Sequence, residues 1–311
     1  MELYLGNNLI DDIKEVINLK DLQRLIILDI SGNNLVRVDN YRIYCIYNLR
    51  RLRVLDGLSV ENSECLEAKE TFAGRLTQEI LEQRLGGNQF NTIKQLDLEG
   101  CKLRDFDKMF DIEYCPNLRE LNLNNNLFAS LRGFGYLPNL IILNIKHNRL
   151  DSLFCKLNED GYPRGLFGLH GLEVLDVSSN CLHDRYGLQL APMKELKILH
   201  AANNEINKVE YLDKLKQLRE LDLSKNRIRQ IDSYSFHSHL IISCLKLDDN
   251  SLKSLANIEK LERLQAFYGG GNRLAEFSEV DRLAELVYLM EISLPGNPMT
   301  RKLQYRNNII R

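Results

Sequence analysis

Residues 25–35 read LIILDISGNNL, a stretch that places apolar side chains and one asparagine in a fixed order. The order is L-x-x-L-x-L-x-x-N-x-L, and its specified positions are filled by Leu25, Leu28, Ile30, Asn33 and Leu35. Apolar residues on either side of Asp29 have the two-residue period of a β-strand, so they are expected to point into a core. The asparagine amide then offers donors and an acceptor to backbone groups that water cannot reach.

The same order recurs along the whole chain. A partial copy precedes it, at Leu3, Leu5, Asn8 and Ile10. Nine copies follow it, and their asparagine position is filled by Cys101, Asn126, Asn148, Asn180, Asn204, Asn226, Asn250, Asn272 and Asn297. These anchors are separated by 25, 22, 32, 24, 22, 24, 22 and 25 residues. Cys101 lacks the amide, so we expect the turn at that position to be less well satisfied.

A repeated unit of this size predicts a solenoid, in which each repeat contacts only its neighbours and the core grows lengthwise. The pattern is that of the leucine-rich repeat. Parallel strands stacked in this way must be covered on their apolar side by the returning segments. We therefore expect an α/β fold with a concave parallel sheet and short helices or 3₁₀ turns on the convex side. Residues 93–297 are predicted to form one uninterrupted curved sheet of nine parallel strands, with Leu121, Leu143, Leu175 and Leu221 buried.

Repeats of about 22 residues resemble the short intracellular class of leucine-rich repeat proteins, typified by a regulatory subunit of protein phosphatase one. Proteins of that class end an array with a cap, in which a Tyr-Arg pair and a helix precede a closing L-x-x-L-D-G. After Asn33 the cap residues are Tyr41, Arg42, Ile46, Leu52, Leu55, Asp56 and Gly57. After Asn297 the same spacing gives Tyr305, Arg306 and Ile310, without the closing motif.

The position of the first cap predicts two arrays in one chain. Residues 1–58 are expected to be the end of an upstream array with its cap, 59–88 a helical linker, and 89–311 a second array with an incomplete cap. Both ends look cut, so we expect the chain to be a piece of a longer protein.

An amphipathic helix is predicted over residues 63–85 of the linker. Phe72, Leu76 and Ile80 follow one another at helical spacing, and Gly86-Gly87 ends the pattern. Such a helix either seals the open edge of the second array or binds a partner. The sequence leaves both interpretations open.

Composition and cysteine usage restrict the class of partner and the compartment. The chain has 311 residues and a formal net charge of −2, so nothing in its charge favours nucleic acid or an anionic membrane. It has no apolar run long enough to span a bilayer and no signal-peptide pattern. Seven scattered cysteines, with no cap cluster and no N-x-S/T site, favour a reducing, cytoplasmic location. The resemblance to the short class further implies a cilium or axoneme.

Signatures of catalysis and of cofactor binding are not found in the sequence. We therefore predict no enzymatic activity, no cofactor, no metal site and no small-molecule substrate. Residues 268–272, Tyr-Gly-Gly-Gly-Asn, lack the Lys-Ser/Thr of a phosphate loop, and Gly269 is expected to leave a thin, weakly packed repeat. His237 and His239 are interpreted as loop histidines, because no further ligand lies nearby. The excess residues 154–165 are either solvated chain or a binding rim.

The concave face is the predicted site of a protein partner. Residues just before the first core leucine of each strand form one row, in which Ile142, Val174 and Ile198 are flanked by Glu120 and Glu220. The middle row, between the two core positions, adds Asn144, Asp176, His200, Asp222 and Tyr268. Three aligned aliphatic side chains with acidic flanks suggest a partner that has an apolar centre and basic neighbours. The competing interpretation is that β-branched residues simply suit strands.

The sequence thus favours a non-catalytic scaffold that binds proteins. The alternative is a regulatory subunit that targets or inhibits a phosphatase or another enzyme, which the resemblance also implies. Absence of tryptophan, a residue enriched at interface hot spots, weakens that alternative.

Overall fold

The structure is a computed structural model, which describes residues 1–87, 89–106, 110–131, 134–153, 165–183, 190, 193–210, 212–237, 240–303 and 305–306. The chain divides into two compact units, Met1–Arg75 and Leu76–Arg311, and the division falls inside the predicted linker. Cys155, His239, Ile310 and nearly all of the excess residues 154–165 lie outside the described residues.

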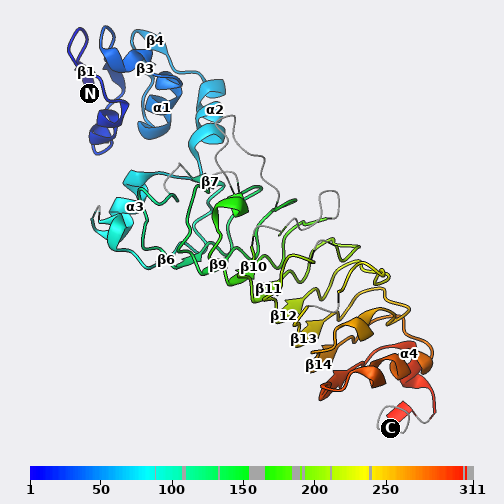
Figure 1. Ribbon diagram of the computed structural model, residues 1–311. Coiled ribbons are helices and arrows are strands. Elements are labelled where there is room, and N and C mark those ends of the chain that lie inside the picture. The colour runs from blue at the N-terminus through cyan, green and yellow to red at the C-terminus, as the bar shows by residue number, and fades with distance from the viewer. Residues whose placement is uncertain are drawn as a thin grey trace. The chain divides into compact units, whose positions relative to one another are not determined.

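The first unit contains a four-stranded sheet in the order β1-β2-β3-β4 (Figure 1). Strands β1 (Glu2–Tyr4), β2 (Ile27–Asp29) and β3 (Val54–Leu55) are parallel, and β4 (Leu58–Ser59) returns antiparallel to β3. Two 3₁₀ helices, Ile13–Leu19 and Asn34–Arg37, and two α-helices, α1 (Tyr41–Asn48) and α2 (Asn62–Phe72), complete the unit.

The prediction of one helix over residues 63–85 is wrong. Helix α2 ends at Phe72, because Ala73 is extended and Gly74 has a φ of 80°, where a side chain would be strained. A second helix, α3 (Gln78–Leu85), follows the short strand β5 (Arg75–Leu76). Phe72 packs edge-on against Tyr44 of α1, with 5.5 Å between ring centroids, so α2 belongs to the core of the first unit.

The second unit contains the predicted nine-stranded parallel sheet, in the order β15-β14-β13-β12-β11-β10-β9-β8-β6. Figure 1 shows these strands side by side, one step per repeat. The strands are β6 (Gln95–Asp97), β8 (Glu120–Asn122), β9 (Ile142–Asn144), β10 (Val174–Asp176), β11 (Ile198–His200), β12 (Glu220–Asp222), β13 (Cys244–Lys246), β14 (Ala266–Tyr268) and β15 (Glu291–Ser293). Leu121, Leu143, Leu175 and Leu221 are all buried, which confirms the predicted register.

The segments that return from one strand to the next in the second unit contain short elements. They are β7 (Asp105–Phe106), helix α4 (Ser278–Asp281), and the 3₁₀ helices Phe90–Thr92, Gly165–Gly168, Ile258–Lys260, Arg282–Glu285 and Pro298–Arg301. At the start of this unit, Leu76 and Leu81 are buried in the core beside Phe90 and Leu96. Helix α3 therefore contributes Leu81 to the core of the array, whereas its Ile80 and Leu85 are exposed.

Buried asparagines tie each repeat to the one before it. Asn226 is typical: its Nδ2 donates to the backbone oxygens of Ala201 and Leu223, both at 3.0 Å, and its Oδ1 accepts from the N–H of Ile206 at 3.0 Å. The side chain thus satisfies backbone groups of two repeats that have no access to water. Cys101, which has no amide, donates from its Sγ to the Glu99 oxygen at 3.4 Å.

The residue that precedes each anchor adopts a left-handed backbone. The φ of this residue lies between 53° and 75° in all the anchored repeats, including the repeat of Asn33 in the first unit. Glycine fills the position only at Gly32, Gly100, Gly271 and Gly296. Elsewhere it is an asparagine, serine, histidine, lysine or aspartate, as in Lys225 and Asp249. A left-handed residue costs roughly 1–2 kcal/mol unless it is glycine. The hydrogen bonds of the adjacent asparagine offset that cost.

The expectation that Gly269 weakens its repeat is wrong. A Cβ at Gly269 would lie 3.0 Å from the ring of Phe267 and 3.1 Å from Leu294. Phe267 occupies the preceding core position, where other repeats have leucine, and it is fully buried. The larger ring therefore fills the volume that the glycine leaves.

Candidate functional site

The sheet of the second unit aligns the residues of the predicted partner-binding row. Glu120 pairs in register with Ile142, Ile142 with Val174, Val174 with Ile198, and Ile198 with Glu220. The three aliphatic side chains are partly exposed and lie on adjacent strands β9, β10 and β11. They form a continuous apolar stripe, which we call the aliphatic stripe, across the centre of the sheet.

The middle row places His200, Asp222 and Tyr268 on the same face. His200 is in register with Asp222, and Lys246 separates Asp222 from Tyr268. A hydrogen bond to Glu291 raises the pKa of Tyr268. All eight predicted partner-binding residues therefore lie on one face of one sheet.

A contact that the sequence analysis did not predict engages Glu220. Its Oε1 lies 2.7 Å from Lys246 Nζ and 3.2 Å from His200 Nε2. Hydrogen bonding to Lys246 holds the pKa of Glu220 below its usual range, and the same bond raises the pKa of Lys246. The two flanks of the aliphatic stripe are therefore chemically unequal. Diagonal positions on adjacent strands are within reach of long side chains, so the alignment of repeats contains the signal for this cluster.

Acidic side chains dominate the concave surface. We add a third row, formed by the residues two positions after each middle-row residue. Across the three rows there are eight carboxylates, at Asp97, Glu99, Glu120, Asp176, Glu220, Asp222, Asp248 and Glu291. Two lysines, Lys146 and Lys246, are the basic residues of these rows, apart from His200. This face is much more acidic than the whole chain, whose formal net charge is −2.

Some of these carboxylates have a structural role in the turns. Oδ1 of Asp97, Asp176 and Asp222 accepts the backbone N–H two residues further on, at 2.9 Å in each case. Asp29 makes the same contact with Ser31 in the first unit. The turn accounts for a short polar residue at this position, which Asn122 also fills. It does not account for Glu99, Glu120 or Glu220.

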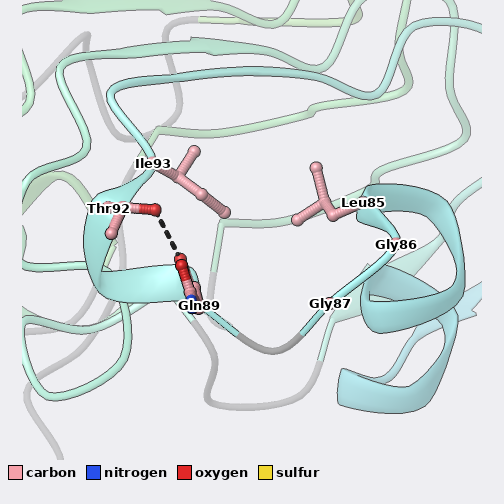
Figure 2. A pocket seen from close by; sticks show the side chains of 6 residues that line it. All are labelled: Leu85, Gly86, Gly87, Gln89, Thr92 and Ile93. Atoms are coloured by element: carbon pink, nitrogen blue, oxygen red, sulfur yellow. Dashed lines mark hydrogen bonds between the residues drawn. The ribbon is translucent and has the colours of Figure 1, made fainter.

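A pocket lies in the second unit, between α3 and the 3₁₀ helix Phe90–Thr92. It is lined by Leu85, Gly86, Gly87, Gln89, Thr92 and Ile93. Figure 2 shows Leu85 and Ile93 on opposite sides of the space, and the Thr92 hydroxyl donates to the Gln89 oxygen at 2.9 Å. No titratable side chain is among the residues that line it. The pocket therefore offers no group for acid–base chemistry.

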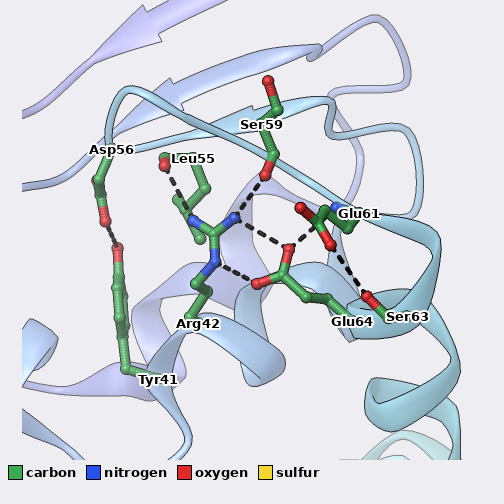
Figure 3. Close-up of polar contacts among 8 residues, drawn as sticks. All are labelled: Tyr41, Arg42, Leu55, Asp56, Ser59, Glu61, Ser63 and Glu64. Carbon is green, nitrogen blue, oxygen red and sulfur yellow. Dashed lines mark hydrogen bonds and ion pairs between the residues drawn. The ribbon is translucent and has the colours of Figure 1, made fainter.

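The Tyr-Arg and L-D-G residues of the first unit form a structural cap (Figure 3). Asp56 has a φ of 51°, which turns its backbone away from the sheet. Its Oδ1 accepts the N–H of Ile30 at 2.8 Å, in place of the carbonyl that a further strand would supply, and its Oδ2 accepts the Tyr41 hydroxyl at 2.8 Å. The aspartate thereby ends the ladder of parallel strands without an unsatisfied buried donor.

Arg42 joins the cap to α2. Its guanidinium donates to the backbone oxygens of Leu55 at 3.1 Å and Ser59 at 2.9 Å. It also forms a two-pronged ion pair with Glu64, at 2.6 and 3.1 Å. The Glu64 carboxylate in turn accepts the N–H of Glu61, which completes a capping box at the start of α2. These contacts hold the cap together, which gives the cluster a structural role.

The Arg42–Glu64 pair predicts a pH dependence of stability. Hydrogen bonding to Arg42 lowers the pKa of Glu64. The folded state therefore binds a proton at Glu64 less tightly than the unfolded state does. The ion pair stabilises the fold at pH values above the ordinary glutamate pKa. This stabilisation is lost as the pH falls through the lowered pKa of Glu64. We expect Glu64→Gln to reduce the free energy of unfolding at about pH 7 and to have little effect near pH 3, measured by urea denaturation. An equal effect at both values would contradict the assignment.

Metal-binding clusters of three or more His, Cys, Asp or Glu side chains are absent from the part of the chain that the structure describes. Cys45, Cys65, Cys101, Cys115, Cys181 and Cys244 are free thiols. Burial raises the pKa of Cys45 to about 12 and that of Cys115 to about 11, so both are inert apolar side chains near neutral pH. Within the same described residues, no helix has both the length and the apolar character required to cross a membrane.

Comparison with known proteins agrees with the fold. The chain belongs to the leucine-rich repeat family, which matches residues 1–86 and 202–311. Among solved structures, an internalin from Listeria monocytogenes has a TM-score of 0.55 at 16% identity and covers 99% of this chain and 84% of its own. A second internalin, C2, has a TM-score of 0.55 at 21% identity over 70% of this chain and 91% of its own. These likenesses show the solenoid fold.

Three curated relatives give further matches. Tubulin-specific chaperone E of Xenopus laevis is 26% identical over 81% of this chain and 49% of its own length. Lumican of Mus musculus is 31% identical over 60% of this chain and 54% of its own length. The alpha subunit of human geranylgeranyl transferase type-2 is 30% identical over 61% of this chain and 32% of its own length. The chain spans about half the length of the first two of these relatives and a third of the last.

Proposed function

We propose that the chain is a non-catalytic module that binds a protein partner on the concave face of its second unit. The observation that carries this proposal is the aliphatic stripe, Ile142, Val174 and Ile198, held in register on three adjacent strands. Burial of three such side chains contributes roughly 5–9 kcal/mol before the costs of association. That amount alone gives at most weak binding, so the polar rows must also contact the partner.

The finer proposal is an intracellular scaffold, cytoplasmic and associated with a cilium or axoneme. Serial short-repeat arrays with an internal cap resemble leucine-rich repeat-containing protein nine, and relatives of this short class are frequent in cilia. The name of the relative from Xenopus laevis refers to tubulin, which supports the same setting.

The alternative is a regulatory subunit that targets or inhibits a phosphatase or another enzyme. One observation favours it: the match to the alpha subunit of a geranylgeranyl transferase, by its name a component of an enzyme. Affinity purification of the tagged chain from ciliated and non-ciliated cells separates the two. Recovery of axonemal proteins supports the scaffold, and recovery of a phosphatase or other enzyme in both cell types supports regulation.

The concave site itself is tested by the double substitution Val174→Asp with Ile198→Asp. Both side chains are partly exposed, so we expect the variant to fold and to lose at least tenfold in affinity for its main partners, about 1.4 kcal/mol or more. The measurement is quantitative affinity capture with wild-type and variant chains. Gln217→Asp with Gln230→Asp is the charge-matched control, because both residues are exposed on returning segments. A folded double variant that keeps every partner would show that the aliphatic stripe is only strand composition.

A further inference from the structure

We infer that the partner presents a basic cluster to one end of the concave sheet, over β6 and β8, and aliphatic side chains to β9, β10 and β11. This inference rests on the proposed function and assigns the chemistry of the bound segment and the flank that its basic end contacts. It follows from a difference between the two acidic flanks of the aliphatic stripe.

The first-row carboxylate of the flank at β12, Glu220, is paired within the protein. Glu220 accepts from Lys246 at 2.7 Å and from His200 at 3.2 Å. A basic partner residue would have to compete with Lys246 for the same oxygen. Lys246 would also repel that residue, so this flank is a poor site for a cation.

The flank at β6 and β8 keeps its charge. Its carboxylates belong to Asp97, Glu99 and Glu120, and none of them forms an ion pair in the described part of the chain. Glu99 accepts hydrogen bonds from the side-chain amides of Asn122 at 3.2 Å and Asn125 at 2.6 Å. Neutral amides orient this carboxylate without neutralising it, which leaves a fixed anionic group for a cation to approach.

Basic residues near this flank restrict the direction of approach. Lys94 and Arg119 are exposed immediately before β6 and β8, whereas Asp97 and Glu99 lie at and beyond the end of β6. Lys146, in the third row, follows β9. The partner's cations are therefore expected near the carboxyl ends of β6 and β8, between these basic groups.

Strand spacing sets the length of the partner segment. Three intervals separate β8 from β11, which at about 4.8 Å each give roughly 14 Å. An extended chain covers that distance in about four residues. The segment should therefore have Lys or Arg followed, or preceded, by aliphatic residues within about four positions.

Fluorescence anisotropy with the full chain and labelled synthetic peptides tests the inference. The probe is Lys-Arg-Lys-Gly-Val-Ser-Ile-Ser-Val, and its controls replace the basic residues with Glu or the aliphatic residues with Ser. We expect each control to bind about tenfold more weakly than the probe, or worse, and the probe's affinity to fall as salt is raised.

Substitutions then distinguish the two flanks. Glu99→Gln should weaken binding of the probe about tenfold or more, and Glu220→Gln less than about threefold, because the second flank lies beyond the screening length at physiological salt. Glu262→Gln changes the net charge by the same amount as both variants, at an exposed site off the concave face, and should have little effect. Circular dichroism checks that each variant is folded.

Two results overturn the inference. One is a probe that binds no better than its Glu control, and the other is Glu220→Gln weakening the probe as much as Glu99→Gln. If the probe does not bind but Val174→Asp with Ile198→Asp abolishes capture of natural partners, the proposed function stands and the partner chemistry assigned here is wrong. If neither effect is seen, both fail.

Discussion

Replacing Asn226 with alanine is expected to destabilise the second unit by about 3–5 kcal/mol. The substitution leaves the N–H of Ile206 without its partner. It also removes one of the two amide donors to each of the oxygens of Ala201 and Leu223, which keep Asn204 and Asn250 respectively. Asn226 is buried, so water cannot readily replace the lost contacts. The unsatisfied N–H costs about 1–3 kcal/mol, and each of the two lost hydrogen bonds to the oxygens costs about 0.5–1.5 kcal/mol. Urea denaturation of the full chain, followed by circular dichroism, measures the change.

Gln217→Ala is the matched control for Asn226→Ala. Gln217 belongs to the same repeat and is exposed, so its removal should change the free energy of unfolding by less than about 0.5 kcal/mol. If Asn226→Ala proved equally harmless, the asparagines would not be the groups that hold neighbouring repeats together.

Replacing Asp56 with alanine is expected to destabilise the first unit by about 2–4 kcal/mol. One part of the loss comes from the N–H of Ile30, which the carboxylate caps at 2.8 Å. A second comes from the Tyr41 hydroxyl, bonded at 2.8 Å. The third comes from the left-handed backbone at position 56, which aspartate tolerates better than alanine.

Two further variants separate these contributions. Asp56→Asn keeps an acceptor for Ile30 and tolerates a left-handed backbone, so it should lose less stability than Asp56→Ala. Tyr41→Phe removes one hydrogen bond and should cost about 0.5–1.5 kcal/mol. Thermal denaturation of the set, in parallel, gives the order. If Asp56→Ala were as stable as wild type, the L-D-G motif would not be what ends the sheet.

The sequence was sufficient to predict the sheet of the second unit. Apolar residues at a two-residue period, followed by an asparagine at a constant distance, define strand, inward face and turn in each repeat. Because the pattern recurs, the register of one strand fixes that of the next, and Ile142, Val174 and Ile198 could be placed in one row. The unequal flanks were missed because Glu220 and His200 were considered row by row and Lys246 was not considered, whereas the contacts of Glu220 are diagonal.

The break between α2 and α3 could not be predicted from apolar spacing. Phe72 and Leu76 have helical spacing, yet Phe72 packs on α1 in the first unit and Leu76 is buried in the core of the second. Gly74, with its positive φ, lies between them and supplied the only local signal. Left-handed residues before the anchors were also missed, since Lys225 and Asp249 do not signal such a backbone by type. The left-handed backbone at these positions goes with the hydrogen bonds that each anchor asparagine makes to the neighbouring repeat.

Photo-crosslinking in cells tests most directly the claim that partners bind the concave face. A photoreactive phenylalanine analogue is placed at His200 or Asn144 on that face, and at Lys208 or Lys253 on returning segments. All four side chains are at least partly exposed, so each site should accept the analogue. The account predicts that His200 and Asn144 yield crosslinks to the same partner and that the returning segments yield few or none. Crosslinks of that partner to Lys208 or Lys253, with none from the concave face, would contradict it.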